Sequence, residues 1–159
     1  MYEKYRWFVV ILVLFLVSAS LVGCSAGTSS QTERAHDVAM AEVSSMPSQV
    51  QNAPQVVRDG YRFAATHADV LHQIPCYCGC GAMGRGSNYA CFWQENGQVD
   101  EHALNCGICV DIAQDVRRGL ERGQSLAEIR AQIDADYSRF GPATDTAPVA
   151  VVAKQTTDR

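Results

Sequence analysis

The sequence has few charged residues and no concentration of positive charge. Of its 159 residues, 13 are Lys or Arg and 17 are Asp or Glu, which gives a formal net charge of −4. Nucleic-acid-binding proteins need a basic patch to neutralise phosphates, so nucleic acid is excluded as a partner. A mildly acidic surface also gives no electrostatic attraction to anionic lipid.

The sequence signatures of common enzymes are also missing. The chain has no internal repeats, no Ser/His/Asp set, no glycine-rich phosphate loop and no pair of carboxylates placed for hydrolysis. We therefore do not expect a hydrolase. Large apolar side chains are scarce in the part of the chain that we expect to fold. A domain of about ninety residues with so small a core needs disulfides or a bound metal to be stable.

The amino end has the pattern of an export signal. Lys4 and Arg6 precede a run, residues 7–24, that contains no charged residue. This is a basic segment followed by an apolar one, as in secretory signals, although the run is nearly long enough for an uncleaved membrane helix. The run ends in "LVGC", which resembles a bacterial lipobox. That resemblance implies cleavage of a signal peptide, residues 1–23, and diacylation of Cys24. Both interpretations place the remaining chain outside the cytoplasm, tethered to a membrane.

The rest of the chain divides by composition. Residues 24–51 begin as a Ser/Thr/Gly-rich stretch, which we interpret as a flexible tether that holds a domain clear of the bilayer. Residues 52–142 are the predicted folded domain. Residues 143–159, after Gly141 and Pro142, are a predicted disordered tail.

The predicted domain is mainly α, with three helices and a long loop rich in cysteine and glycine. The first helix covers about residues 53–66, with Asn52 as its cap and Pro54 in its first turn. A single helical face with Asn105 as its cap predicts the second helix, which ends at Gly123; the face contains Cys106, Cys109, Ala113, Val116 and Leu120.

The third predicted helix opens with a capping box. Ser125 and Glu128 have the spacing of that motif. The buried face follows at helical spacing and consists of Leu126, Ile129, Ile133 and Tyr137.

The loop between the first two helices, residues 75–104, has no regular pattern. Asn96 and Gly97 favour a tight hairpin between Trp93 and Val99. A loop of this length in a compact domain needs something to hold it. Four cysteines lie within it, which makes them the candidate fastening.

Six cysteines remain once Cys24 is assigned to lipid: Cys76, Cys78, Cys80, Cys91, Cys106 and Cys109. An even number outside the cytoplasm is typical of a disulfide framework. However, a disulfide within a Cys-x-Cys segment would close a small strained ring. Cross-links from the loop to the second helix stay open.

A soft metal is the alternative use for these thiols. Cys106 and Cys109 form a Cys-x-x-Cys at a helix start, where the helix dipole stabilises thiolates. Thiolates select Cu(I), Zn(II) or an iron–sulfur cluster. Zinc takes four ligands, whereas sulfurs that bridge several Cu(I) ions suit six thiolates better, so we favour Cu(I) over Zn(II). An exported chain would have to acquire an iron–sulfur cluster outside the cell, which disfavours that cofactor.

Non-cysteine ligands are limited to a few residues. His102 lies four residues before Cys106, and we include it in the predicted metal site. His72 lies four residues before Cys76, and Met83 has a thioether that suits copper. Both are weaker candidates, because single surface histidines and methionines are common.

Four segments of the chain, "IPCYCGCG", "GSNYACFW", "EHALNCGICVDIA" and "GQSLAEIRAQIDADY", resemble the bacterial PCYCGC-motif lipoproteins. The resemblance covers about residues 52–142. It implies a small exported or lipid-anchored protein, with metal binding suspected for the six cysteines and His102. The chain departs from the family at Arg85, where many members have a histidine, so the coordination number of the site is open.

The last third, from "CGICVDIA" to "YSRFG", is similar to the helical module of CcmH-type cytochrome c maturation proteins. Those proteins are thiol–disulfide reductants. The likeness implies a three-helix fold and keeps a redox role for Cys106 and Cys109 open.

Three functions follow from these patterns. The first is a membrane-anchored protein that binds copper or zinc for storage, delivery or homeostasis, with a metal-trafficking or thioredoxin-like partner. The second is a thiol–disulfide oxidoreductase in cytochrome c or oxidase maturation that uses Cys106 and Cys109. The third is a disulfide-stapled interaction module without chemistry of its own.

Overall fold

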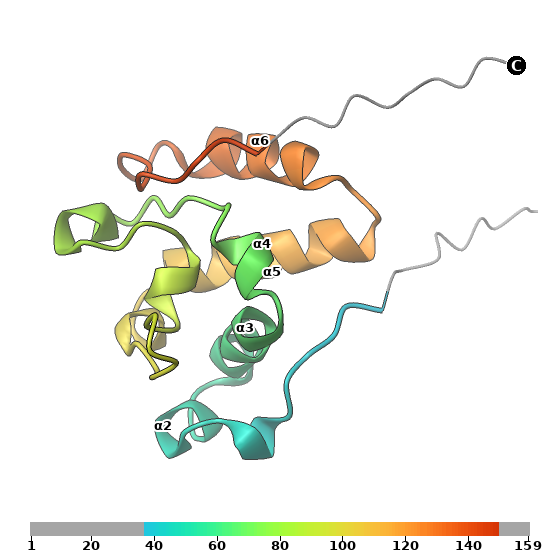
Figure 1. The fold of residues 1–159 in the computed structure, drawn as a ribbon, viewed down its shortest axis with the longest axis vertical. Helices are drawn as coiled ribbons and strands as arrows, with labels where there is room; N and C mark the ends of the chain where they lie inside the picture. Colours follow the sequence, from blue (N-terminus) through green and yellow to red (C-terminus); the bar gives the residue numbers. More distant parts are fainter. Residues whose placement is uncertain (1–36, 150–159) are drawn as a thin grey trace, which may run out of the picture. The chain divides into compact units, whose positions relative to one another are not determined.

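A computed structural model describes residues 37–149, and this part of the chain is mainly helical (Figure 1). The predicted signal peptide, Cys24, the first part of the predicted tether (24–36) and residues 150–159 lie outside the described residues. None of the helices between residues 37 and 149 is long and apolar enough to cross a membrane.

The three predicted helices form the framework. They are α3 (Gln55–Thr66), α5 (Gly107–Glu121) and α6 (Leu126–Tyr137). Helix α5 packs against both α3 and α6, so it is the central element (Figure 1). The predicted buried face of α6 is confirmed for Ile129, Ile133 and Tyr137. The mainly α fold class is therefore confirmed.

The helix ends are partly as predicted. The capping box of α6 is present, because the Ser125 hydroxyl accepts from the backbone N–H of Glu128 and the Glu128 carboxylate accepts from that of Ser125. Gly123 follows α5 with a φ of 71°, which favours glycine.

Two predicted caps are wrong. Pro54 and Cys106 occupy the N-cap positions of α3 and α5, in place of Asn52 and Asn105. Both asparagines are instead the C-caps of shorter helices that come before α3 and α5. Asn52 is the C-cap of α2 (Ser48–Gln51), and Asn105 is the C-cap of the 3₁₀ helix η5 (His102–Leu104).

The second half of the predicted tether is folded. It contains the 3₁₀ helix η2 (Val43–Ser45) and helix α2, which packs against α3. Met46 and Val50 are buried in the core, and the Arg62 side chain donates to the carbonyl of Ala41. The overall Ser/Thr-rich composition of residues 24–51 suggested a flexible tether, although this segment also contains these apolar side chains, which pack over part of α3.

The first residues of the predicted disordered tail are also placed. Thr144 is buried and pairs with Cys76 through two hydrogen bonds, described below. Gly141 allows the chain to return, because a Cβ there would lie 2.9 Å from the carbonyl oxygen of Tyr77. Residues 141–146 therefore pass directly over the cysteine loop.

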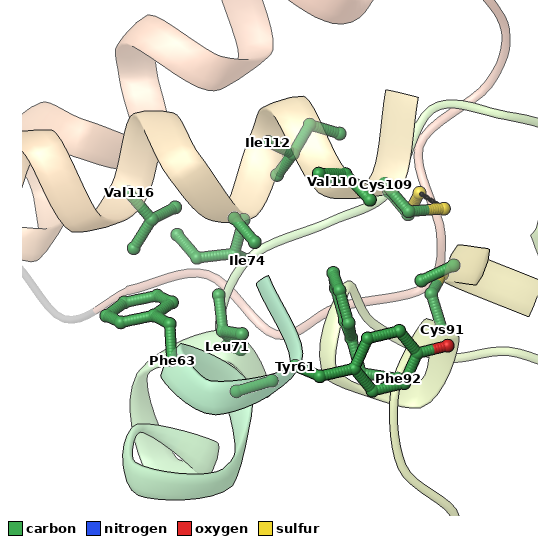
Figure 2. Packing of buried hydrophobic residues seen from close by; sticks show 14 of the residues in the cluster. Tyr61, Phe63, Leu71, Ile74, Cys91, Phe92, Cys109, Val110, Ile112 and Val116 are labelled. Carbon is green, nitrogen blue, oxygen red and sulfur yellow. Dashed lines mark hydrogen bonds between the residues drawn. The ribbon is translucent and has the colours of Figure 1, made fainter. Parts of the chain in front are cut away.

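The hydrophobic core runs without a break into the cysteines (Figure 2). The Tyr61 and Phe92 rings meet edge to face at 5.0 Å. Gly60 permits this approach of α3 to the loop, because a Cβ there would lie 3.0 Å from the Phe92 ring. The predicted hairpin is confirmed by the antiparallel bridge between Trp93 and Val99, with Gly97 at a φ of 79°.

Candidate metal centre

Short helical turns and one long helix bring the cysteines together. Helix α4 (Ala68–Leu71) leads to the buried residues Ile74 and Pro75, and the PCYCGC segment follows. Gly79, with a φ of 83°, turns the chain into the 3₁₀ helix η3 (Cys80–Met83). A second 3₁₀ helix, η4 (Tyr89–Cys91), presents Cys91 to the core. Cys106 and Cys109 come from the start of α5.

Three sulfurs form a nearly equilateral triangle. The Sγ atom of Cys76 lies 3.5 Å from that of Cys78 and 3.4 Å from that of Cys109, and the Cys78 and Cys109 sulfurs are 3.5 Å apart. Two residues of the loop thus meet one residue of α5. Figure 2 shows Cys109 and Cys91 at the edge of the apolar cluster, where the loop approaches α5.

The other donors adjoin this triangle. The Nε2 atom of His102 lies 3.4 Å from the Cys78 sulfur, and the sulfurs of Cys80 and Cys91 are 3.6 Å apart. A bonded disulfide has a length of about 2.05 Å. No disulfide forms among residues 37–149, and all six thiols are free.

Three overlapping four-donor groups could hold a metal ion. They are Cys76, Cys78, Cys91 and Cys109; Cys78, Cys80, Cys91 and His102; and Cys78, His102, Cys106 and Cys109. Within each group the ligand atoms lie within 4.8 Å of one another. All six predicted cysteines and His102 are therefore part of one cluster, and Cys78 belongs to every group.

The cluster is closed on one side and open on the other. Cys76, Cys80, Cys91 and Cys109 are each 0% exposed. Cys78, Cys106 and His102 are partly exposed. Solvent therefore reaches the cluster at the side formed by these last three residues.

The thiols hold protons unevenly. A hydrogen bond from Cys109 lowers the pKa of Cys76 from 9.0 to about 7, and the same neighbour lowers the pKa of Cys80. The pKa of Cys109 itself is raised, mainly by these hydrogen bonds to Cys76 and Cys80. Burial, followed by the charge of Cys76, raises the pKa of Cys78. The cluster therefore resists loss of all its protons unless a cation replaces them.

Arg85 does not take the place of a ligand. Its Nη2 atom donates to the Oδ1 atom of Asp100 at 2.7 Å, and the same oxygen accepts the backbone N–H of His102 at 2.9 Å. The backbone carbonyl of Asp100 accepts from the Tyr61 hydroxyl at 2.6 Å. Arg85 thus fixes Asp100, which in turn fixes the start of η5 and so the imidazole of His102.

The two weaker candidate ligands, His72 and Met83, make other contacts. His72 is exposed, and its ring contacts that of Tyr89 at a tilt of 39°, with centroids 4.3 Å apart. Met83 is 58% exposed, and its sulfur lies 3.8 Å from the Nη1 atom of Arg85.

Two supporting residues were missed from the sequence. The Thr144 hydroxyl accepts the N–H of Cys76 at 2.9 Å, and the Thr144 N–H donates to the Cys76 carbonyl at 3.0 Å. Asn88 is fully buried, and its Nδ2 atom donates to the carbonyl of Cys109 at 3.1 Å. Thr144 gave no local signal. Asn88 lies in the "GSN" segment quoted for the family resemblance, which pointed to its position but not to its contact.

One comparison with known proteins identifies the family of this chain. The family model described as "Protein of unknown function with PCYCGC motif" matches residues 13–149. No curated protein and no solved structure matches the chain. The likeness of the last third to CcmH-type proteins stays a prediction. The model's match spans most of the chain and includes the motif at residues 75–80, so this chain belongs to the PCYCGC-motif family of proteins of unknown function.

Proposed function

We propose that this protein is a membrane-anchored, extracytoplasmic lipoprotein that binds a soft metal ion for storage, delivery or homeostasis. The main support is the convergence of six free thiols and one imidazole in overlapping groups whose ligand atoms lie within 4.8 Å of one another. These donors come from the cysteine loop and from the start of α5, and they span residues 76–109 of the chain. Such a concentration of soft ligands matches thiolate-binding metals better than hard cations.

The distances between the sulfurs fit a metal of this class. A tetrahedral zinc ion with bonds of about 2.3 Å to sulfur separates its sulfurs by ~3.8 Å. The triangle of Cys76, Cys78 and Cys109 has sides of 3.4–3.5 Å. It would open by only a few tenths of an ångström to accept an ion. We favour Cu(I) over Zn(II) because the cluster holds more thiols than one zinc ion needs.

The membrane link in this proposal is Cys24. The "LVGC" segment supports cleavage before Cys24 and its diacylation, which would hold the domain at the outer face of the cell membrane. The partly exposed side of the cluster, at Cys78, His102 and Cys106, would then face a metal-trafficking or thioredoxin-like partner. Such a partner would exchange the ion or keep the thiols reduced.

A redox role for Cys106 and Cys109 is the second candidate. Cys106 is partly exposed at the N-cap of α5, and Cys109 lies one turn further along the helix. Thiol–disulfide oxidoreductases use this spacing. The burial of Cys109 against the sulfurs of Cys76 and Cys78 favours a ligand role over exchange with a partner.

The test is elemental analysis combined with thiol counting on one sample isolated from native membranes. Bound copper or zinc, together with six thiols that become reactive after chelation, supports the proposal. Absence of metal with no reactive thiols would favour the disulfide-stapled module. Absence of metal with a reversible Cys106–Cys109 couple would favour the oxidoreductase. A Cys24→Ser variant serves as a control, because it should lose the lipid and keep its metal.

A further inference from the structure

We propose that the site holds two soft metal ions rather than one, with the sulfurs of Cys78 and Cys109 bridging them. This inference rests on the proposed metal-binding function. It adds the number of ions, the ligands of each ion and the identity of the bridges.

The number of donors is the first argument. A four-coordinate ion uses four ligands, whereas the cluster offers six sulfurs and one imidazole nitrogen. A single ion would leave at least two buried or half-buried thiols unused beside it. The remaining donors lie within 4.8 Å of one another in the overlapping groups, so the surplus can bind a second ion.

The overlap of the three groups limits how two ions can share them. A sulfur can bind two ions, but a histidine nitrogen has one lone pair and binds one. This excludes the pair of groups that have Cys78 and His102 in common. Two pairs remain: one shares Cys78 and Cys109, and the other shares Cys78 and Cys91. Cys78 is a bridge in both.

The second bridge is assigned to Cys109. Its sulfur lies 3.5 Å from that of Cys78 and 3.4 Å from that of Cys76, so it occupies the centre of the cluster. Two ions on either side of the Cys78–Cys109 edge, with bonds of about 2.3 Å, would be ~3 Å apart. This pairing uses Cys106, which the other pairing leaves without a role. It leaves out Cys80, whose sulfur contacts that of Cys91 at 3.6 Å.

The two ions would have different surroundings. The inner ion takes Cys76 and Cys91, both fully buried, together with the two bridges. The outer ion takes His102 and Cys106, both partly exposed, and the same bridges. The outer ion is therefore the one that exchanges with a partner, and the inner ion is retained.

Charge supports the second ion as well. The two groups together contain five thiolates, more negative charge than one divalent ion can neutralise. Two Zn(II) ions would leave a net charge of −1 and two Cu(I) ions a net charge of −3, so with either metal a second ion lowers the excess negative charge. An uncompensated charge in a buried site is costly, and four of the six cysteines are fully buried.

The experiment titrates cadmium, a soft divalent probe, into the reduced full-length Cys24→Ser protein in detergent. Native mass spectrometry counts the ions, and cadmium NMR reports whether two bound ions are coupled through a shared sulfur. Two coupled ions are expected. A single ion would overturn this inference and leave the proposed function standing. No bound ion would overturn both, and two uncoupled ions would overturn the bridges.

Three variants test the assignment of ligands. Cys106→Ser and His102→Ala should each retain one ion, because they remove ligands of the outer ion only. Cys80→Ser tests the alternative pairing, and His72→Ala, which removes an imidazole outside the three groups, is the matched control that should retain two coupled ions. Loss of an ion from Cys80→Ser but not from Cys106→Ser would overturn Cys109 as the second bridge. The number of bound ions is measured only in folded protein, and circular dichroism checks that each variant keeps its helices.

Discussion

The cysteine loop, residues 75–106, and the helix pair α5–α6 are stabilised in different ways. The helix pair has regular backbone hydrogen bonds, a capping box and buried apolar side chains. The loop has three short 3₁₀ helices and one isolated bridge. It is held by its sulfurs and by single contacts with distant residues. The helix pair can thus form from local patterns, whereas under the proposed function the loop depends on the metal that its thiols bind.

Glycine use shows the same contrast. Gly119 lies within α5, where a Cβ would meet the Ile129 side chain at 2.6 Å, so glycine there serves close helix packing. Gly79 and Gly84 lie in the loop with positive φ and open space around them. In the loop, these glycines instead allow the backbone to change direction, so that the chain turns around the thiols.

Removal of metal should separate the two regions most strongly. A ligand at 1,000 times its dissociation constant stabilises the folded state by about 4 kcal/mol, so chelation should lower the melting temperature. Hydrogen exchange should quicken in residues 76–92 and stay slow in α6. Equal acceleration in both regions would show that the loop has no separate dependence on metal.

Ile133→Ala should damage the helix pair and spare the metal site. Ile133 is 1% exposed in the core, and its truncation should cost about 2–5 kcal/mol of unfolding free energy. Urea titration measures the loss, and Gln132→Ala, an exposed neighbour, is the control. The number of ions per folded molecule should not change. A lower number would mean that α6 supports the thiols directly.

Thr144→Val should weaken the attachment of the cysteine loop, although Thr144 itself lies outside that loop. It removes the acceptor of the buried Cys76 N–H, which should cost about 1–3 kcal/mol. Metal affinity, measured by competition with a chelator, should fall as well, because Cys76 is less well held. Thr144→Ser retains the hydroxyl and should retain the affinity. Equal metal affinity in both variants would show that the hydrogen bond from Cys76 to the Thr144 hydroxyl has no role in metal binding.

Ser125→Ala should have the smallest effect. It removes the capping box of α6 and should lower the unfolding free energy by about 1 kcal/mol, with Ser125→Thr nearly unchanged. Metal affinity should be the same in all three proteins. A shift in affinity would contradict the separation of the two regions.

The sequence predicted what local patterns control. The spacing of apolar residues located α3, α5 and α6, and the Ser125–Glu128 motif located the start of α6. The convergence of the thiols followed from the Cys-x-x-Cys position and the family resemblance. Composition misled at both domain edges, because a few buried side chains, such as Val50 and Thr144, decide where packing begins and ends.

The supporting contacts of the site could not be predicted. Arg85 and Asp100 pair across the loop, and Cys76 and Thr144 are 68 residues apart in the chain. Such pairs depend on where distant segments meet in space. The role of Arg85, open at the level of sequence, is clear only because the same Asp100 oxygen also holds the backbone of His102.

The two hydrogen bonds between Thr144 and Cys76 affect the order in which the thiol site forms as the chain is made and exported. The chain is synthesised, and under the proposed function exported, from its amino end. All six thiols of the site therefore emerge before α6 and before Thr144, which accepts the N–H of Cys76. During that interval the PCYCGC segment has been made, but its hydrogen bonds to Thr144 have not yet formed. The site is therefore completed last, and a nascent chain halted within α6 would display its thiols without their final closure.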